Sequence, residues 1–553
     1  METKESYSKF RDEWGIRPVP PLPNKPIYKI VAEGAKKWPK KDALICLGSR
    51  LTYKELDELS NRLAFALADR LGVKKGDRVA AMLPNCIQHT LVFFAVNKLG
   101  AIHVPCNVMY KSREVEQQLN DCGAKVFITL GSLPILPIVE AIKDKTSVEH
   151  IIVTNIEDFA TSQEEIPPIF RAENKEFPGT QLLSLLEKQG ELPEVKITPS
   201  EDLSLILYTA GTTGVPKGVM ETHKTVWSCV HPTKYIFDFD EEDVNLQIMP
   251  MFHCSGYCLV QLPILYSGGT SVLVPLFDAK NCLRWIQDHR VTRIFAPPTF
   301  FVGLMNVPEI RSYDLSGLKT TLSCGAPQPP PLRGEWKGIT GLGLLDGYGL
   351  TETMCQGASV VSMPNKYKPG AIGPAFNCEV KIADERGKIV PRGTVGEFMF
   401  RGDGVAKGYW NKPEETKVAF LDDGWLHTGD AGYMDDEDFM YFVDRYKDLI
   451  VASGYNVAPA EVEGVLMGHS AVKEAGVVGV PDEYRGETVR AFVSLKEGYK
   501  GKVTEEEIIE HCKKNLATFK VPKSVEFIEE IPKNPVGKIL RRALREEGAK
   551  KIK

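Results

Sequence analysis

The stretch Leu205-Ile-Leu-Tyr-Thr-Ala-Gly-Thr-Thr-Gly-Val-Pro-Lys-Gly218 is the most informative in the chain. An apolar, strand-like run leads into a loop dense in glycine and threonine. Glycines let backbone N–H groups approach an anion, hydroxyls add donors and a lysine adds charge. The loop therefore suits a phosphate, although such a loop taken alone is as often a structural turn. It is not a Walker loop, because Lys217 follows Pro216 and precedes Gly218.

The first third of the chain alternates helical and strand patterns. Apolar residues three and four apart between Leu51 and Leu67 predict an amphipathic helix. A strand at 76–83, a helix through 91–99 and a strand at 101–105 follow. This order predicts parallel sheets with helices on their faces.

A different pattern begins near Lys447, after a segment rich in glycine, aspartate and tryptophan. Beyond it the sequence predicts a helix, three strands and a capping box from Thr504 to Glu507 that opens a second helix. These elements suffice for a compact α+β domain of roughly 105 residues. A domain boundary is therefore expected near Lys447.

Composition excludes several classes of protein. Of the 553 residues, 43% are hydrophobic and 25% are charged, which excludes disordered and collagen-like chains. A chain of this length is too long for one compact core. The net charge of -5 provides no broad basic face, so a nucleic-acid partner is not expected.

Cysteine usage and hydropathy indicate a cytoplasmic protein without a transmembrane segment. The twelve cysteines include no Cys-x-x-Cys pair, and Cys254 and Cys258 beside His253 have no further close ligands. Reduced, buried thiols are therefore expected rather than zinc. The segment Met1–Trp14 lacks the apolar core of a signal peptide, and no apolar run approaches ~20 residues. Peripheral membrane contact, and the choice between monomer and homodimer, stay open.

Four further motifs follow the glycine-rich loop. In Asp346-Gly-Tyr-Gly-Leu-Thr-Glu-Thr353, Tyr348 offers an aromatic face, Thr351 a phosphate donor and Glu352 an oxygen ligand for Mg²⁺. Asp430, after a glycine turn, is suited to a ribose diol. The remaining two are Asp444-Arg445 and Pro532–Arg542. Taken singly, each has an ordinary alternative: a helix-start carboxylate, a turn or a solvated charge.

Together and in this order, the five motifs resemble the adenylate-forming superfamily of acyl-CoA synthetases, aryl-CoA ligases, luciferases and peptide-synthetase adenylation domains. The resemblance extends from Leu51 to Leu540. It implies an α/β fold with a large N-terminal domain (1–444) of two doubly wound subdomains plus a small β-barrel. A hinge (445–449) and a small mobile α+β C-terminal domain (450–553) would follow.

The resemblance also implies a function for each matching position. The phosphate loop would be formed by Thr209, Gly211, Thr212, Thr213, Gly214 and Lys217. The adenine would be framed by Gly325, Ala326, Pro327, Asp346, Gly347 and Tyr348. Thr351 would contact phosphate, and Glu352 would ligate Mg²⁺. The ribose would be bound by Asp430 and Arg445, and the α-phosphate and the carboxylate by Lys538. Lys447 would be the pivot, and Gly454 would admit the pantetheine arm of coenzyme A.

Two positions depart from the commonest family pattern. Ala210 replaces the usual serine of the phosphate loop, and Val536 replaces a small or hydroxyl residue in the lysine loop. The first change removes one hydrogen-bond donor, so weaker nucleotide binding is expected rather than loss of activity.

The expected reaction is ATP-dependent activation of a carboxylic acid to an acyl adenylate, followed by transfer to coenzyme A. Amino-acid-activating relatives carry an Asp in the motif that here reads Pro250-Met-Phe-His-Cys-Ser-Gly-Tyr257, so an amino acid is not expected. No tryptophan closes the pocket beside Tyr348, so a medium- or long-chain fatty acid is favoured over acetate. The pocket is expected to include His253, Tyr257 and Phe300, with Cys324 and Cys355 as further wall positions.

Several alternatives stay open. An aryl or branched acid could replace the fatty acid, and a carrier protein could replace coenzyme A as the acceptor. A light-emitting oxygenase would share every motif. A non-catalytic binding protein is disfavoured because Lys538, Glu352 and Asp430 are all present.

Overall fold

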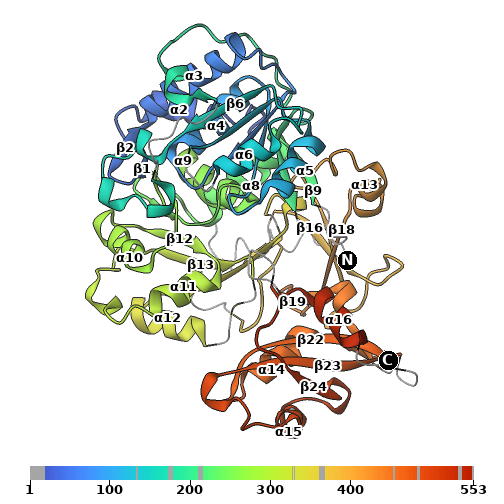
Figure 1. The fold of residues 1–553 in the computed structure, drawn as a ribbon. Coiled ribbons are helices and arrows are strands. Elements are labelled where there is room, and N and C mark those ends of the chain that lie inside the picture. Colours follow the sequence, from blue (N-terminus) through green and yellow to red (C-terminus); the bar gives the residue numbers. More distant parts are fainter. Residues whose placement is uncertain are drawn as a thin grey trace. The chain divides into compact units, whose positions relative to one another are not determined.

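The computed structural model describes twelve stretches of the chain (Figure 1): residues 19–131, 135–171, 179–209, 216–326, 328, 331–355, 357–359, 368–375, 377–452, 455–482, 486–533 and 539–550. Two compact units are present. One comprises Met1–Val380 with Phe400–Leu426, and the other comprises Lys381–Met399 with His427–Lys553. A hinge is a place where the chain moves, and a division into compact units does not test motion. The hinge expected at 445–449 therefore stays a prediction.

The first unit contains a seven-stranded sheet in the order β7-β6-β5-β3-β4-β8-β9. Its strands are β3 (Arg78–Met82), β4 (Ile102–Pro105), β5 (Val126–Leu130), β6 (His150–Thr154), β7 (Thr180–Gln181), β8 (Leu203–Thr209) and β9 (Lys217–Thr222). All neighbouring pairs are parallel except β8 and β9, which are antiparallel. The glycine-rich loop of the sequence thus joins two adjacent antiparallel strands.

An eight-stranded sheet completes the first unit, in the order β15-β14-β13-β12-β10-β11-β1-β2. Its strands are β1 (Asp42–Cys46), β2 (Ser49–Thr52), β10 (Val244–Gln247), β11 (Thr270–Leu273), β12 (Arg293–Ala296), β13 (Thr320–Cys324), β14 (Leu345–Gly349) and β15 (Gly357–Ser359). The pairs β1–β2 and β14–β15 are antiparallel, and the rest are parallel. Two largely parallel sheets confirm the predicted α/β fold.

Helices connect these strands. They are α2 (Lys29–Lys37), α3 (Tyr53–Asp69), α4 (Ile87–Lys98), α5 (Ser112–Cys122), α6 (Leu136–Ile142), α7 (Leu182–Leu186), α8 (His223–Ile236), α9 (Leu262–Ser267), α10 (Ala279–Asp288), α11 (Pro298–Met305), α12 (Leu332–Thr340) and α13 (Pro413–Ala419). In Figure 1, α10, α11 and α12 lie side by side near β12 and β13. Helix α3 covers most of the predicted amphipathic stretch and is capped by Thr52, whose hydroxyl accepts the backbone N–H of Glu55.

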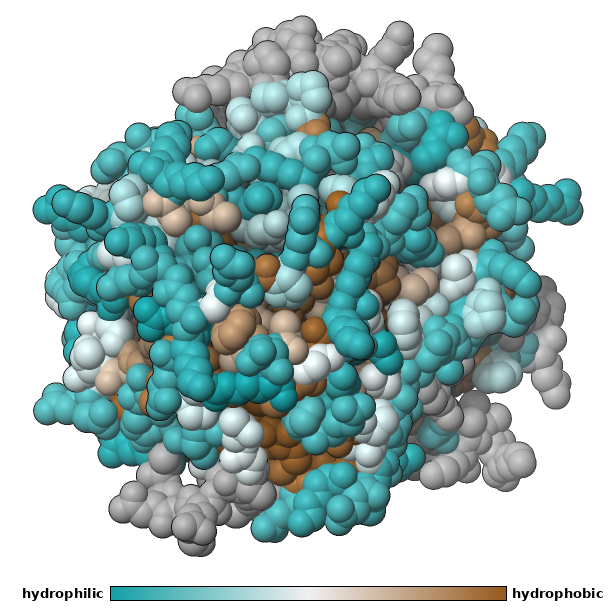
Figure 2. Space-filling view, turned by 90° about the horizontal axis from the view of Figure 1, so that it is seen from above, coloured by the Kyte–Doolittle hydropathy of each residue, from teal (hydrophilic) through white to brown (hydrophobic). Residues whose placement is uncertain are grey.

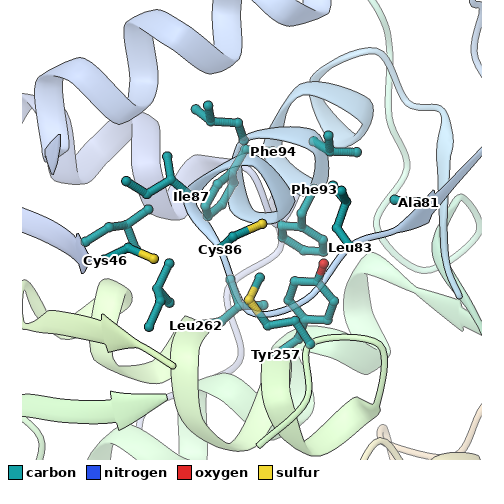
Figure 3. Close-up of a cluster of buried hydrophobic side chains, with 14 of the residues drawn as sticks. Cys46, Ala81, Leu83, Cys86, Ile87, Phe93, Phe94, Tyr257 and Leu262 are labelled. Carbon is teal, nitrogen blue, oxygen red and sulfur yellow. The ribbon is translucent and has the colours of Figure 1, made fainter. Parts of the chain in front are cut away.

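Helix α4 lies in the core of the first unit, and all of its residues are buried. Such a helix needs apolar neighbours on every side. Figure 3 shows Phe93 and Phe94 of α4 beside Tyr257 and Leu262, which come from a different part of the chain. The Phe93 and Tyr257 rings stack with centroids 4.7 Å apart. The contact holds the segment after β10 against the helix that follows β3.

A four-stranded sheet has the order β16-β17-β18-β19. Its strands are β16 (Glu379–Ala383), β17 (Gly396–Arg401), β18 (Leu426–Met434) and β19 (Met440–Arg445). The hairpin of β18 and β19 pairs Asp430 with Arg445.

The second unit also contains a five-stranded sheet, β21-β20-β23-β22 with β24 paired to β23. Its strands are β20 (Ile450–Ala452), β21 (Tyr455–Val457), β22 (Val472–Asp482), β23 (Gly486–Leu495) and β24 (Ser524–Phe527), with helices α14 (Pro459–Met467), α15 (Glu505–Asn515) and α16 (Arg541–Lys550). Val477 packs in one apolar cluster with residues of α14 and α15, whereas Val478 packs in another with Leu544 of α16. Since neighbouring strand residues face opposite sides, helices cover both faces of the sheet. This confirms the predicted α+β domain.

Figure 2 shows a face covered largely by hydrophilic side chains, with smaller hydrophobic patches between them. In the described stretches, no helix is long and apolar enough to cross a membrane. None of the twelve cysteines, all of which lie in the described stretches, forms a disulfide.

Candidate functional site

The structure brings Lys217 and Glu352 to the same aromatic side chain. The hydroxyl of Tyr409 donates a hydrogen bond to Glu352 Oε1 at 3.0 Å. Lys217 Nζ lies 4.8 Å from the centre of the Tyr409 ring. The glycine-rich loop and the Glu352 motif, both predicted to bind the nucleotide, therefore meet at Tyr409.

Strand pairing positions Tyr409 at this site. The backbone N–H of Met220 in β9 donates to Gly408 O at 2.9 Å, and the N–H of Trp410 donates to Gly218 O at 2.7 Å. Val219 and Tyr409 form an antiparallel bridge. Residues around Tyr409 thus extend the edge of the seven-stranded sheet.

A tight turn after β14 presents Thr351 and Glu352. The 3₁₀ helix Thr351–Thr353 follows Leu350, and the backbone N–H of Cys355 closes the turn by donating to Leu350 O at 2.8 Å. A Cβ atom on Gly349 would lie 2.3 Å from Cys355 O, so this close approach requires glycine. Ala406 N–H donates to Glu352 O at 3.0 Å, which ties the turn to the segment that carries Tyr409.

The residues predicted to frame the adenine lie at the ends of two neighbouring parallel strands. Gly347 in β14 is paired with Cys324 in β13, and Gly325 follows directly with φ of 82°. Asp346 in β14 is half-buried; burial raises the pKa of its carboxyl to about 6, while Arg333 acts in the opposite direction. Ala326 is exposed. The Tyr348 and Phe400 rings lie 6.1 Å apart, so one strand end carries a carboxyl and an aromatic ring side by side.

The predicted acyl pocket residues lie in three different environments. His253 is exposed, with Nδ1 2.9 Å from Ser255 Oγ. Tyr257 is fully buried in the cluster of Figure 3, and its hydroxyl lies 3.0 Å from His103 Nε2. Phe300, in α11, is buried against Phe277, with ring centroids 5.3 Å apart. Whether they line an acyl pocket stays a prediction.

A π-helix, Ser255–Gln261, begins two residues after His253 and leads into α9. Helices of this type often occur at functional sites. Cys254, just before it, lies 3.7 Å from Thr351, measured from Sγ to Oγ1. The segment between β10 and α9 therefore contacts the turn that carries Glu352.

In the second unit, the residues predicted to bind ribose form an ion pair. Arg445 Nη1 lies 2.9 Å from Asp430 Oδ1, and the Asp430 side chain is only 3% exposed, compared with 43% for Arg445. The two residues are direct partners in the β18–β19 hairpin. A buried carboxylate held by an exposed guanidinium suits a ligand that approaches from the Arg445 side.

Buried charges stabilise the chain just before the predicted pivot. Asp444 accepts backbone N–H groups of Arg445 at 2.7 Å and Ala460 at 3.1 Å, and Arg541 lies 3.6 Å away. Burial nevertheless raises the pKa of the Asp444 carboxyl above its ordinary value. The backbone of Lys447 belongs to the 3₁₀ turn Tyr446–Asp448 between β19 and β20.

Part of the predicted site lies outside the described residues. Thr209 is the last residue of β8, where the phosphate loop begins. The predicted positions that fall outside the described stretches are Gly211, Thr212, Thr213, Gly214, Pro327, Gly454 and Lys538, as well as the departures Ala210 and Val536.

The donor set at Glu352 fits a magnesium ion that arrives with a nucleotide. Among the described residues, no group of three or more His, Cys, Asp and Glu side chains could hold a metal ion. Mg²⁺ in nucleotide sites is usually bound by one or two carboxylates plus phosphate oxygens and water. The carboxylate of Glu352, oriented by the Tyr409 hydroxyl, is the one protein ligand that such a site needs.

Two residues near the site were not found by sequence reasoning. Tyr409 lies in Gly408-Tyr-Trp410, which carries no chemical signature of its own. Glu221, in β9, is fully buried. Burial raises the pKa of the Glu221 carboxyl well above its ordinary value, the Thr225 hydroxyl opposes this, and the charges of Cys254 and Glu352 add to it. The strand reads Lys217-Gly-Val-Met-Glu-Thr222, and with only two adjacent apolar residues it gives no pattern that marks Glu221 as buried.

Comparisons with known proteins identify relatives along almost the whole chain. The family described as AMP-binding enzyme matches residues 31–410, and the AMP-binding enzyme C-terminal domain matches residues 461–538. A long-chain-fatty-acid–CoA ligase of Bacillus subtilis (strain 168) is 40% identical over 547 residues, covering 95% of each protein.

Two solved structures have similar folds. ATP-bound MatB from Rhodopseudomonas palustris aligns with a TM-score of 0.81 and 29% identity, covering 94% of this chain and 98% of that one. The anthranilate CoA ligase AuaEII, in complex with anthranoyl-AMP, aligns with a TM-score of 0.83 and 28% identity, covering 96% of this chain and 98% of that one.

Proposed function

The chain belongs to the family of AMP-binding enzymes, and from this premise we propose that it is an AMP-forming acyl-CoA synthetase. It converts a carboxylic acid and ATP to an acyl adenylate and pyrophosphate, then transfers the acyl group to coenzyme A and releases AMP. The observation that carries the proposal is the meeting of Lys217 and Glu352 at Tyr409. Relatives named as CoA ligases, one of them with an acyl adenylate, support the same reaction.

Adenylation brings two anions together, because a carboxylate attacks the α-phosphorus of ATP. Positive charge and hydrogen-bond donors placed where negative charge accumulates lower the barrier to such a step. The residues proposed to supply them are Lys217 and Thr351, with Lys538 reaching both the carboxylate and the α-phosphate. Glu352 would hold the Mg²⁺ of the nucleotide, which neutralises phosphate charge.

The second half-reaction needs a path for the thiol of coenzyme A. We assign the hinge to residues 445–449, with Lys447 as the pivot between 1–444 and 450–553. Rotation there would withdraw Lys538 after adenylation and bring Gly454 to the pantetheine arm. The short turn Tyr446–Asp448 between two strands suits a pivot, since few residues need to change conformation.

A medium- or long-chain fatty acid is the proposed substrate. The 40% identical relative is named as a long-chain-fatty-acid ligase, and the motif Pro250–Tyr257 offers no carboxylate for a substrate ammonium. An aryl acid is the second candidate, because the structure of an anthranilate ligase covers nearly the whole chain. A carrier protein instead of coenzyme A is a further alternative acceptor.

One panel of acids tests the proposal. Straight-chain acids from acetate upward, aryl acids and amino acids are each supplied with ATP, Mg²⁺ and coenzyme A, and pyrophosphate, AMP and thioester are measured. Burial of each added methylene is worth about 0.8 kcal/mol, so kcat/KM should rise about three- to fourfold per CH₂ until the pocket ends. A flat profile, or a preference for an amino acid, would refute the fatty-acid assignment. No pyrophosphate release with any acid would refute the reaction itself.

We also propose that the protein acts in the cytoplasm, where ATP and coenzyme A are available and where structural disulfides are rare. Fractionation of cells that express the protein tests this compartment. A monomer and a homodimer are both compatible with the proposed chemistry, which uses residues of one chain.

A further inference from the structure

Two cysteines that are distant in the sequence meet beside the Glu352 turn. The thiol of Cys355 donates to Cys254 Sγ, with the sulfurs 2.9 Å apart. Cys254 is the residue just before the π-helix, and Cys355 ends the turn that begins with Thr351. Formation of a disulfide, with sulfurs about 2.05 Å apart, would require them to approach by only about 0.9 Å.

The pair is accessible from one side. Cys254 is 1% exposed, whereas Cys355 is partly exposed. Ten other cysteines are present, and nine of them are buried, so Cys378 is the one that matches Cys355 in exposure. Cys355 is therefore the side from which a small oxidant would approach the pair.

The surroundings of Cys254 favour its thiolate. Burial opposes ionisation, but the Cys355 thiol, His253 and Thr351 outweigh it and hold the pKa of Cys254 well below its ordinary value. Burial and the neighbouring sulfur of Cys254 raise the pKa of Cys355. Glu221, Cys229, Cys258 and Cys324 also face Cys254, and burial keeps all four protonated by raising their pKa values. A low-pKa thiolate beside a protonated thiol is the arrangement expected of an oxidisable pair.

We propose that Cys254 and Cys355 form an oxidation site, and that hydrogen peroxide converts them to a disulfide that stops adenylation. The Cys254 thiolate attacks one peroxide oxygen, the O–O bond breaks, and hydroxide leaves to give a sulfenic acid. Cys355 then attacks the sulfenic sulfur, its proton leaves with the departing oxygen, and water is released. Overall, two thiols supply two electrons and two protons, and one peroxide becomes two waters.

The disulfide would act on the turn that carries Glu352; this part of the inference rests on the proposed function. Met354 and Cys355 both have positive φ, 49° and 63°, so the turn has little freedom to absorb a shift. Bonding Cys355 to Cys254 would move the end of the turn relative to Glu352. A displacement of ~1 Å at a catalytic group can reduce the rate by up to about 100-fold.

The experiment treats the full-length protein with hydrogen peroxide and follows two readouts. Intact mass should fall by about 2 Da, the mass of two hydrogens, and a peptide map should show Cys254 linked to Cys355. In parallel, acid-dependent pyrophosphate exchange should fall by at least about tenfold and return with dithiothreitol. A mass that does not fall, or a cross-link that leaves exchange unchanged, would overturn the proposal.

Two variants sharpen the test, each compared with itself before and after oxidation. Cys355→Ser should lose the cross-link and the dithiothreitol-reversible fall in exchange. Cys378→Ser, the matched control with a partly exposed cysteine, should behave as the unaltered protein does. Equal sensitivity of Cys355→Ser would refute the assignment. If that variant does not fold, the mass and peptide map of the unaltered protein still decide. Absence of exchange in the reduced protein would contradict the proposed function and leave the cross-link readout intact.

Discussion

Replacing Glu221 by glutamine should make the stability of the first unit less dependent on pH. Glu221 lies opposite Leu205 in the β8–β9 pair and is fully buried. In the described residues, neither of its carboxyl oxygens accepts a hydrogen bond, because the nearby Thr225 hydroxyl donates to Thr222 O instead, at 2.9 Å. Burial raises the pKa of this carboxyl well above its ordinary value, so the folded protein keeps the proton to a higher pH than the unfolded chain does.

The direction in which stability changes with pH follows from comparing the protonation of the Glu221 carboxyl in the folded and unfolded states. Below pH ~4.3 the carboxyl is protonated in both states, so the variant and the unaltered protein titrate alike. Above that pH the unfolded chain loses the proton while the folded chain keeps it. Stability of the unaltered protein therefore falls by about 1.4 kcal/mol per pH unit until the folded carboxyl also ionises. Glutamine does not titrate and removes this dependence.

Between pH 5.5 and 7.5 the variant should therefore gain up to about 2.7 kcal/mol relative to the unaltered protein. A gain of 1 kcal/mol shifts the melting temperature of a 150–250-residue domain by about 2–4 °C, and of a larger unit by less. The difference in melting temperature should widen by roughly 2–5 °C over this range. Scanning calorimetry at a fixed scan rate, without nucleotide, measures it.

Glu191→Gln is the matched control, because Glu191 is exposed and solvent reaches it in both states. A pH-dependent gain of the same size in this exposed variant would mean that the effect does not come from burial of the carboxyl. A Glu221→Gln variant that is less stable at every pH would refute the reasoning. That result would mean that the folded protein holds an ionised carboxylate with a partner.

Three further predictions concern the proposed reaction. Lys538→Ala should abolish acid-dependent pyrophosphate exchange but still convert supplied acyl adenylate to thioester; equal loss of both in a folded variant would contradict an adenylation-only function. Lys447→Pro fixes φ near -65° and restricts the preceding residue, so thioester formation should fall much more than pyrophosphate exchange. If both rates fall together, Lys447 is not the pivot. Tyr409→Phe keeps the ring beside Lys217 but removes the hydrogen bond to Glu352, worth about 1.5 kcal/mol for a charged acceptor, so exchange should fall about tenfold. An unchanged rate across the Mg²⁺ titration would show that Tyr409 does not orient Glu352.

Local patterns predicted most of the elements. The capping box at Thr504 is present, with the Thr504 hydroxyl accepting the N–H of Glu507 and the Glu507 carboxylate accepting the N–H of Thr504. The strand predicted at 474–480 is the centre of β22 (Val472–Asp482). These signals are local: a cap satisfies N–H groups within one turn, and burial on both faces makes a strand apolar throughout.

The π-helix Ser255–Gln261 shows where local pattern fails. Its hydrogen bonds connect residues five apart, so its buried face follows neither the helical nor the strand period used to find elements. The motif Pro250–Tyr257 likewise shows only which acidic residues lie within it, and not those that other strands bring close to it. Glu221 interacts with Cys254 from β9, a segment that the motif does not include. It is fully buried, and burial raises the pKa of its carboxyl well above the ordinary value, which disfavours the charged form that a substrate ammonium requires.

The contact of Tyr409 with both Lys217 and Glu352 could not be predicted from any single motif. The sequence indicates that Lys217 and Glu352 each suit a nucleotide, but their meeting depends on the pairing of β9 with the segment around Gly408. Such pairing is long-range and is specified by backbone hydrogen bonds that any residue can make. The aromatic ring and the hydroxyl of Tyr409 then perform two separate tasks, one beside Lys217 and one on Glu352. Because phenylalanine retains the first and removes the second, Tyr409→Phe separates the orientation of the carboxylate from the packing of the sheet edge.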